Sequence, residues 1–174
     1  AELNSKWHDG PSTLSADGNT IYFSSESFKE GEFEKDKTIN AKLSQVNLFK
    51  ATKTGDKWGN ITSLPFNSKE YSTGNPSLSK DGKTLYFASN MPGSVGATDI
   101  WKVAVNADGS FGEPVNLGSN VNTEGEENFP FVSEDNKTLY FASNGRQGMG
   151  GYDVFAYDMA GASVNMAKPI NSEK

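Results

Sequence analysis

The chain contains no cysteine, and among its 174 residues there is one arginine and one histidine. The absence of cysteine excludes disulfides, thiolate metal sites and a cysteine nucleophile. His8 alone is too little for an ordinary metal site, which draws on several His or Cys ligands. No G-x-S-x-G motif accompanies His8 for serine hydrolysis. The sequence therefore predicts no metal, no cofactor and no catalytic residue in this chain.

Clustered positive charge and long apolar runs are also missing. The net charge is −6, and nearly all positive charge is lysine without a basic stripe. Because phosphate binding needs clustered Lys and Arg, nucleic acid is excluded as a partner. No apolar run approaches the ~20 residues of a membrane span, so we expect no direct span. The hydrophobic content of 34% is nevertheless enough for a core.

What the sequence does contain is one pattern repeated three times. Pro76 and Pro130 lie 54 residues apart, and Pro11 and Pro76 lie 65 apart, with most of the extra length of the first copy at residues 26–45. The first parts read GPSTLSADGNTIYFSS (10–25), NPSLSKDGKTLYFAS (75–89) and FPFVSEDNKTLYFAS (129–143). Later in the three copies come the equivalent segments VNLFKA, TDIWKVAV and YDVFAYDM. A fourth set of equivalent segments reads KWGNITSL, FGEPVNLG and, more weakly, ASVNMAKP.

Each of these parts is typical of a β-strand. TLYFAS is β-branched and aromatic with apolar residues on both sides, which predicts a strand covered on both faces. Asp17-Gly18, Asp81-Gly82 and Asp135-Asn136 supply the residue types of tight hairpin turns. At Asn136 we expect a left-handed backbone, because Asn tolerates it better than other non-glycine residues.

Four short strands in a unit of ~54 residues, buried on both faces, are the pattern of a propeller blade. The sequence predicts an all-β fold, a partial β-propeller of three four-stranded antiparallel blades. A β-sandwich, the alternative, does not explain repeats of blade length. The predicted units are 1–71, with an N-terminal connector and the long insert 26–45, then 72–125, and 126–174 with a connector to a further blade.

A short phrase, [FLVI]-N-[ST], precedes the repeats and ends the chain, as in LNSKW, FNSKEY, VNTEGE and PINSEK. We expect it to join the last strand of one blade to the first strand of the next. Three blades are fewer than the four to eight of a closed ring. The sequence therefore predicts that the remaining blades come from the same polypeptide or from a second chain, and that uncovered apolar blade faces call for partners.

The segments NPSLSKDGKTLYFASN with GATDIW, and FPFVSEDNKTLYFASN with GGYDVF, resemble the WD40-like repeats of the TolB type. The combination is similar to the propeller of the large OmpA-family cell-envelope proteins, some of which belong to the type IX secretion and gliding apparatus. The resemblance implies a periplasmic, outer-membrane-associated module that binds or scaffolds other envelope proteins. It implies no peptidoglycan-binding residue, because the OmpA-like domain is absent from these residues.

In a propeller, the fourth-to-first connectors and the second-to-third loops share one rim, where ligands usually meet loops on a rigid scaffold. Arg146 is a candidate for binding a carboxylate through its bidentate fork. Asp99 and Asp153 precede the third strands of two copies and are predicted to bond neighbouring backbone. The candidate ligand- or partner-binding residues are His8, Asp9, Asn75, Asn90, Glu126, Glu127, Asn128, Asn144 and Arg146.

Two alternatives to a scaffold remain open at this stage. The first is a carbohydrate- or peptide-processing propeller, in which a carboxylate pair would come from Asp9, Glu126 and Glu127, since glycosidases need two carboxyls a set distance apart. A lectin-like ligand-binding module is the other. The charged insert carries Phe28 and Phe33 and is interpreted either as a solvated loop or extended hairpin, or as a partner-contact arm.

Overall fold

The computed structural model of the chain describes residues 3, 9–26, 34–36 and 41–173. This part contains fourteen strands, and no helix in it is long and apolar enough to cross a membrane. In chain order the strands are β1 (Asp9–Leu14), β2 (Thr20–Glu26), β3 (Glu34–Asp36), β4 (Ala41–Leu43), β5 (Val46–Thr54), β6 (Lys57–Ser63), β7 (Thr73–Leu78), β8 (Thr84–Ser89), β9 (Asp99–Ala104), β10 (Val115–Asn116), β11 (Glu127–Val132), β12 (Leu139–Ser143), β13 (Asp153–Tyr157) and β14 (Ser163–Asn165).

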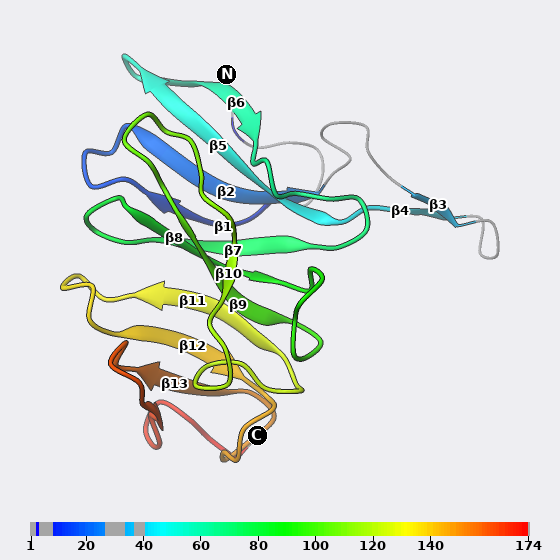
Figure 1. Cartoon of the computed structure of the whole chain (residues 1–174), viewed down its shortest axis with the longest axis vertical. Coiled ribbons are helices and arrows are strands. Elements are labelled where there is room, and N and C mark those ends of the chain that lie inside the picture. Colours follow the sequence, from blue (N-terminus) through cyan, green and yellow to red (C-terminus); the bar gives the residue numbers. More distant parts are fainter. Residues whose placement is uncertain (1–2, 4–8, 27–33, 37–40, 174) are drawn as a thin grey trace.

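Twelve of the strands form three four-stranded antiparallel sheets. Their orders are β1-β2-β5-β6, β7-β8-β9-β10 and β11-β12-β13-β14, which we call blades 1, 2 and 3. Figure 1 shows the blades stacked in sequence order, with the β3–β4 hairpin projecting to the side. The predicted all-β fold of three four-stranded antiparallel units is confirmed. Phe28 and Phe33 of the insert lie outside the described residues.

Each blade opens with a hairpin whose turn is held by a serine and an aspartate. In blade 2 the Ser79 hydroxyl donates to Asp81 at 2.7 Å and accepts from the Thr84 N–H at 2.9 Å. This hydrogen bond lowers the pKa of the Asp81 carboxyl, and Ser15 and Ser133 do the same for Asp17 and Asp135. Asn136 has φ 58°, as predicted for the residue that replaces glycine.

Most β8 and β9 side chains are buried, on both faces of the sheet, because a blade lies against each side. Phe87 and Trp101 pack into the cluster shared with blade 1, whereas Tyr86 and Ile100 pack into the cluster shared with blade 3. Phe87 has 0% of its side chain exposed. Burial of a side chain of this size contributes about 2–3 kcal/mol. The two-sided apolar strands of the sequence are therefore explained by stacking of blades.

The connector asparagine closes the blade that it follows. The Asn122 side chain accepts from the Ile100 N–H at 2.8 Å and donates to the Ile100 carbonyl at 2.9 Å. Asn67 and Asn171 make the same pair of bonds to Leu48 and Val154. In β5, β9 and β13, the asparagine amide thus bonds the backbone N–H and C=O of one residue, as a neighbouring strand would. The phrase in PINSEK therefore completes blade 3 itself, besides any role as a connector.

Candidate functional site

The first strands of the three blades, β1, β7 and β11, are tied to each other by side-chain hydrogen bonds. The Leu78 N–H donates to Thr13 Oγ1 at 3.1 Å, and the Val132 N–H donates to Ser77 Oγ at 3.0 Å. Along them runs a groove of about 350 Å³, which we call the inner-strand groove. It is lined by Pro11, Ser12, Thr13, Leu14, Asn75, Pro76, Ser77, Leu78, Lys80, Phe129, Pro130, Phe131, Val132 and Glu134.

A bulge interrupts each inner strand and turns side chains into this groove. Asn75 and Phe129 stand at equivalent places in β7 and β11, with φ 53° and 52°. A left-handed backbone is rare for phenylalanine, and such outliers concentrate at functional positions. Phe129 is 59% exposed and lines the groove, and Phe131, 62% exposed, stands at its outer edge beside Tyr140.

The repeat alignment needs one correction at these bulges. Thr13, Ser77 and Phe131 face Tyr22, Tyr86 and Tyr140 across the first hairpin of their blades. Pro76 and Pro130 stand directly before the second and third of these residues, whereas Pro11 stands two residues before Thr13. Pro11 is therefore shifted by one position, which agrees with its distance of six residues from Asp17, against five residues from Pro76 to Asp81.

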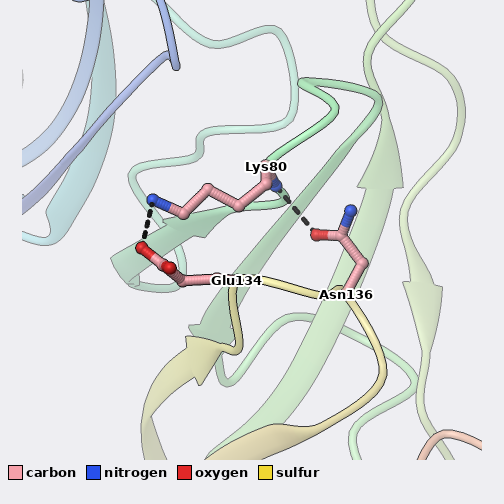
Figure 2. Close-up of polar contacts among 3 residues, drawn as sticks. All are labelled: Lys80, Glu134 and Asn136. Carbon is pink, nitrogen blue, oxygen red and sulfur yellow. Dashed lines mark hydrogen bonds and ion pairs between the residues drawn. The ribbon is translucent and has the colours of Figure 1, made fainter.

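At the hairpin end of the groove, the turns of blades 2 and 3 meet (Figure 2). The Lys80 backbone N–H donates to Asn136 Oδ1 at 2.8 Å, and the Lys80 ammonium lies 3.4 Å from a Glu134 carboxylate oxygen. The ion pair is exposed and contributes little to stability. The asparagine bond, which needs the left-handed turn at Asn136, fixes this end of the groove.

At the opposite end, loops and connectors interlock into a rim. The Ser72 N–H donates to Asn90 Oδ1 at 2.8 Å, and the Glu126 N–H donates to Asn144 Oδ1 at 2.7 Å. The two predicted site residues Asn90 and Asn144 thus hold the segments that enter β7 and β11. A Cβ on Gly96 would overlap backbone carbonyl oxygens of the following connector, so glycine is required there.

Two smaller hollows open at this rim beside the groove. One of about 290 Å³, which we call the rim hollow, is lined by Asn75, Asn90 and Asn128 together with Val46, Ser72, Gly74, Ala88, Ser89 and Thr98. The second, of about 170 Å³, includes Asp9, Glu26 and Asn75. Asn75 therefore lies where the groove and both hollows meet. The structure brings four predicted site residues together here: Asp9, Asn75, Asn90 and Asn128.

The predicted carboxylates do not face one another. Glu127 is fully buried, and its oxygens accept from the Thr123 N–H at 2.8 Å, the Thr123 hydroxyl at 2.7 Å and the Ser143 hydroxyl at 2.5 Å. Glu126 instead accepts from the Tyr152 hydroxyl, and this bond raises the pKa of the tyrosine. Glu127 is thus engaged inside the connector, while Glu126 lies at the rim.

Arg146 and Asp99 are both engaged within blades. The Arg146 guanidinium donates to the Asn120 carbonyl at 2.7 Å and lies over the Phe155 ring at 5.7 Å. Asp99 accepts from the N–H groups of Val95 and Gly96 at 2.6 and 3.1 Å, which confirms its predicted backbone role. Asp153 accepts from the Met149 N–H in the equivalent place.

Sequence reasoning missed the apolar side of the site. Phe129, Phe131 and Leu14 are exposed groove residues that it did not single out, and His8 lies outside the described residues. A signal was present in the repeat itself. Phe129 and Phe131 occur in FPF where the second copy has NPS, so aromatic residues replace polar ones at two inner-strand positions.

The sequence matches no protein-family model and no curated protein, whereas the fold matches solved structures. TolB from Acinetobacter baumannii matches 96% of this chain and 34% of its own, at 16% identity and TM-score 0.58. A protein assigned as TolB from Agrobacterium tumefaciens matches 95% and 50%, at 18% identity and TM-score 0.60. A puromycin-hydrolyzing peptidase of Mycobacterium tuberculosis matches 92% and 23%, at 16% identity and TM-score 0.58.

The chain thus spans half or less of the length of the structures that it matches. At these identities the likeness shows the fold alone. Together with the three stacked blades, it identifies the chain as a β-propeller module similar to those of TolB and of peptidases.

Proposed function

We propose that this module is a non-enzymatic interaction domain that binds segments of other proteins along the inner-strand groove. The observation that carries the proposal is the contrast between the two kinds of side chain at the site. Glu127, Asn144 and Arg146 are engaged in hydrogen bonds within the module. Phe129 and Phe131 are exposed, and exposed apolar patches mark interaction sites.

A periplasmic location, associated with the outer membrane, belongs to the same proposal. It is supported by the resemblance of the repeats to those of OmpA-family envelope proteins. Other envelope proteins are then the partners, as in the scaffolds to which such repeats belong.

A further partner surface is the face of blade 3 that points away from blade 2. Tyr22 and Tyr86 are 3% and 8% exposed because the next blade covers them, whereas the equivalent Tyr140 is only half-buried. Phe131 beside Tyr140 is also exposed, and the two rings lie 6.5 Å apart. A propeller blade with an apolar face, from the same polypeptide or a second chain, would pack on this face as blade 2 packs on blade 1 and blade 3 packs on blade 2.

The competing proposal is a peptide- or carbohydrate-processing enzyme. One of the structures with a similar fold is a peptidase. Its candidate groups are Asp9 and Glu126. Asp9 accepts from the Ser25 hydroxyl at 2.8 Å, and Glu126 accepts from Tyr152. Both carboxylates thus have hydrogen-bond donors within their own blade.

The wild-type chain and a Phe129→Asn variant test the proposal when each is immobilised and incubated with an envelope extract. Asparagine is the residue at the equivalent place in blade 2, Asn75, with the same left-handed backbone, so the fold accommodates it. We expect a set of proteins retained by the wild type and depleted on the variant, with no turnover of peptide or glycan substrates. Turnover that is lost in Glu126→Gln would establish the enzyme instead.

A further inference from the structure

The rim hollow is a cluster of amides at the mouth of the inner-strand groove. Its volume of about 290 Å³ is bounded by Asn75, Asn90 and Asn128, and no Lys, Arg, Asp or Glu is among its described lining residues. Amide side chains both donate and accept hydrogen bonds without carrying charge. A charged group here would find no opposite charge among these lining residues. The hollow therefore suits a neutral group that donates and accepts.

Two amide atoms in the hollow have spare capacity. Asn90 uses Oδ1 to accept from the Ser72 N–H, and its amide nitrogen has no hydrogen-bond partner in the described part of the chain. Asn75 uses its amide nitrogen to donate to Asn128 Oδ1 at 3.3 Å, and its Oδ1 has no partner there either. One donor and one acceptor complement a single residue of an extended main chain, whose N–H and C=O point to the same side.

The hollow continues into an apolar groove, because Asn75 lines both. A ligand that occupies both must carry hydrogen-bonding groups next to apolar ones. An extended peptide does so, since its main chain is polar and its side chains can be apolar or aromatic. An oligosaccharide, which carries hydroxyls along its length, is the alternative ligand class.

We propose that Asn75 and Asn90 bind the main chain of an extended peptide segment, whose apolar side chains enter the inner-strand groove beside Phe129 and Phe131. The inference rests on the proposed function and names the ligand class of that same site. Asn128 is a positioning residue, because its bond to the Asn75 amide nitrogen fixes which end of that amide is left for the ligand.

The sequence offers clean variants for this proposal. Asn75 has φ 53°, a conformation that glycine also adopts without strain, so Asn75→Gly removes the amide and keeps the backbone. Asn90→Asp keeps the oxygen that accepts from Ser72 and removes the spare donor. Asn136→Asp is the matched control, because Asn136 Oδ1 likewise accepts a backbone N–H, but at the opposite end of the groove.

Random heptapeptides displayed on phage are selected on the wild-type chain, and the enriched sequences are synthesised with both ends capped. Their dissociation constants are measured by fluorescence anisotropy, with thermal unfolding as a check on each variant. We expect enriched peptides to carry apolar or aromatic residues. Asn75→Gly and Asn90→Asp should each weaken binding about tenfold or more, which corresponds to loss of one good hydrogen bond. Asn136→Asp should change it less than about twofold.

The outcomes separate this inference from the proposed function. Peptides that bind Phe129→Asn more weakly but bind Asn75→Gly and Asn90→Asp like the wild type would overturn the amide role and leave the interaction module standing. If no peptide is enriched, both proposals fall. Binding of chito- or malto-oligosaccharides in place of peptides would also overturn the inference and point to a lectin-like module.

Discussion

At the scale of single residues, asparagine recurs where connectors and loops are bonded to strands. Asn67, Asn122 and Asn171 each pair with the backbone of a third strand. Asn90 and Asn144 hold the entries to two inner strands. A side-chain amide can replace one peptide unit in a ladder, because it offers the same donor and acceptor. These asparagines therefore stabilise the fold through hydrogen bonds rather than apolar burial.

The connector asparagine can be tested by replacing Asn122 with alanine. Asn122 is 2% exposed, so the change leaves the Ile100 N–H buried without the Asn122 acceptor, while the Ile100 carbonyl still accepts from the Leu117 N–H at 3.2 Å. An unsatisfied buried group costs about 1–3 kcal/mol, and we expect the free energy of unfolding to fall by about that amount. Urea titration measures it. Asn120→Ala, at an exposed side chain two residues earlier, should stay within about 0.5 kcal/mol of wild type. Equal effects of the two substitutions would contradict a stabilising role for the hydrogen bonds between Asn122 and Ile100.

The hairpin turns predict a dependence of stability on acid pH. Hydrogen bonds from Ser15, Ser79 and Ser133 lower the pKa of Asp17, Asp81 and Asp135 below the ordinary value of 3.8. A lowered folded-state pKa gives stability that is complete above the unfolded value and is lost as pH falls through the folded value. Stability should therefore decrease as pH falls below about 4.

The variant Ser79→Ala isolates one of these turns. In it the pKa of Asp81 should rise towards 3.8, because its largest stabilising hydrogen bond is gone. Carboxyl titration by NMR measures this shift. The difference in unfolding free energy between wild type and variant should narrow as pH falls, and a difference independent of pH would contradict this account of the turn.

At the scale of elements, the rim depends on the close approach of the β8–β9 loop to the connector before β11. Gly96 has no room for a side chain because the Thr123 and Gly125 carbonyls lie against it. We expect Gly96→Ala to destabilise the chain by about 1–3 kcal/mol through overpacking. Gly151→Ala in the β12–β13 loop has no atom within 4 Å of the added carbon and should be near neutral. Thermal unfolding measures the stability of both variants. If Gly96→Ala is as stable as the wild type, the loop moves to make room for the added carbon, which would contradict this account of the rim.

Strands and turns were predictable from sequence because each carries a local signature. The Asp-Gly and Asp-Asn turns and the apolar strands on either side of them were all identified from residue type and order. The inner-strand bulges were not, because the side-chain directions of Asn75 and Phe129 depend on pairing with the second strand. The β14 strand has three residues, which fits the weaker pattern of ASVNMAKP, whereas the two-residue length of β10 was not predicted.

In the candidate site, too, some features were predictable from the sequence and others were not. Asn75, Asn90 and Asn128 were singled out because propeller geometry places their loops at one rim. Glu127 was singled out on the same ground, yet it is fully buried, since its direction depends on Thr123 and Ser143 contacts that no local pattern shows. Polar residues near a rim can be predicted from topology, whereas whether each faces a ligand or the core depends on its packing.

At the scale of the whole molecule, the three blades act as one wall. Their inner strands are cross-linked by Thr13 and Ser77, and their turns by Lys80 and Asn136. Rigid walls of this kind bind with little loss of conformational entropy. The propeller likeness supplies the fold, and the groove supplies the reason to expect a bound polypeptide segment there.

Hydrogen exchange of backbone amides, measured with and without a peptide selected on the wild-type chain, tests this claim most directly. If the inner-strand groove is the binding surface, protection on binding should gather on β1, β7 and β11 and on the rim around Asn75 and Asn90. The outer strands β6, β10 and β14 should exchange as before. Protection confined to those outer strands would contradict the account.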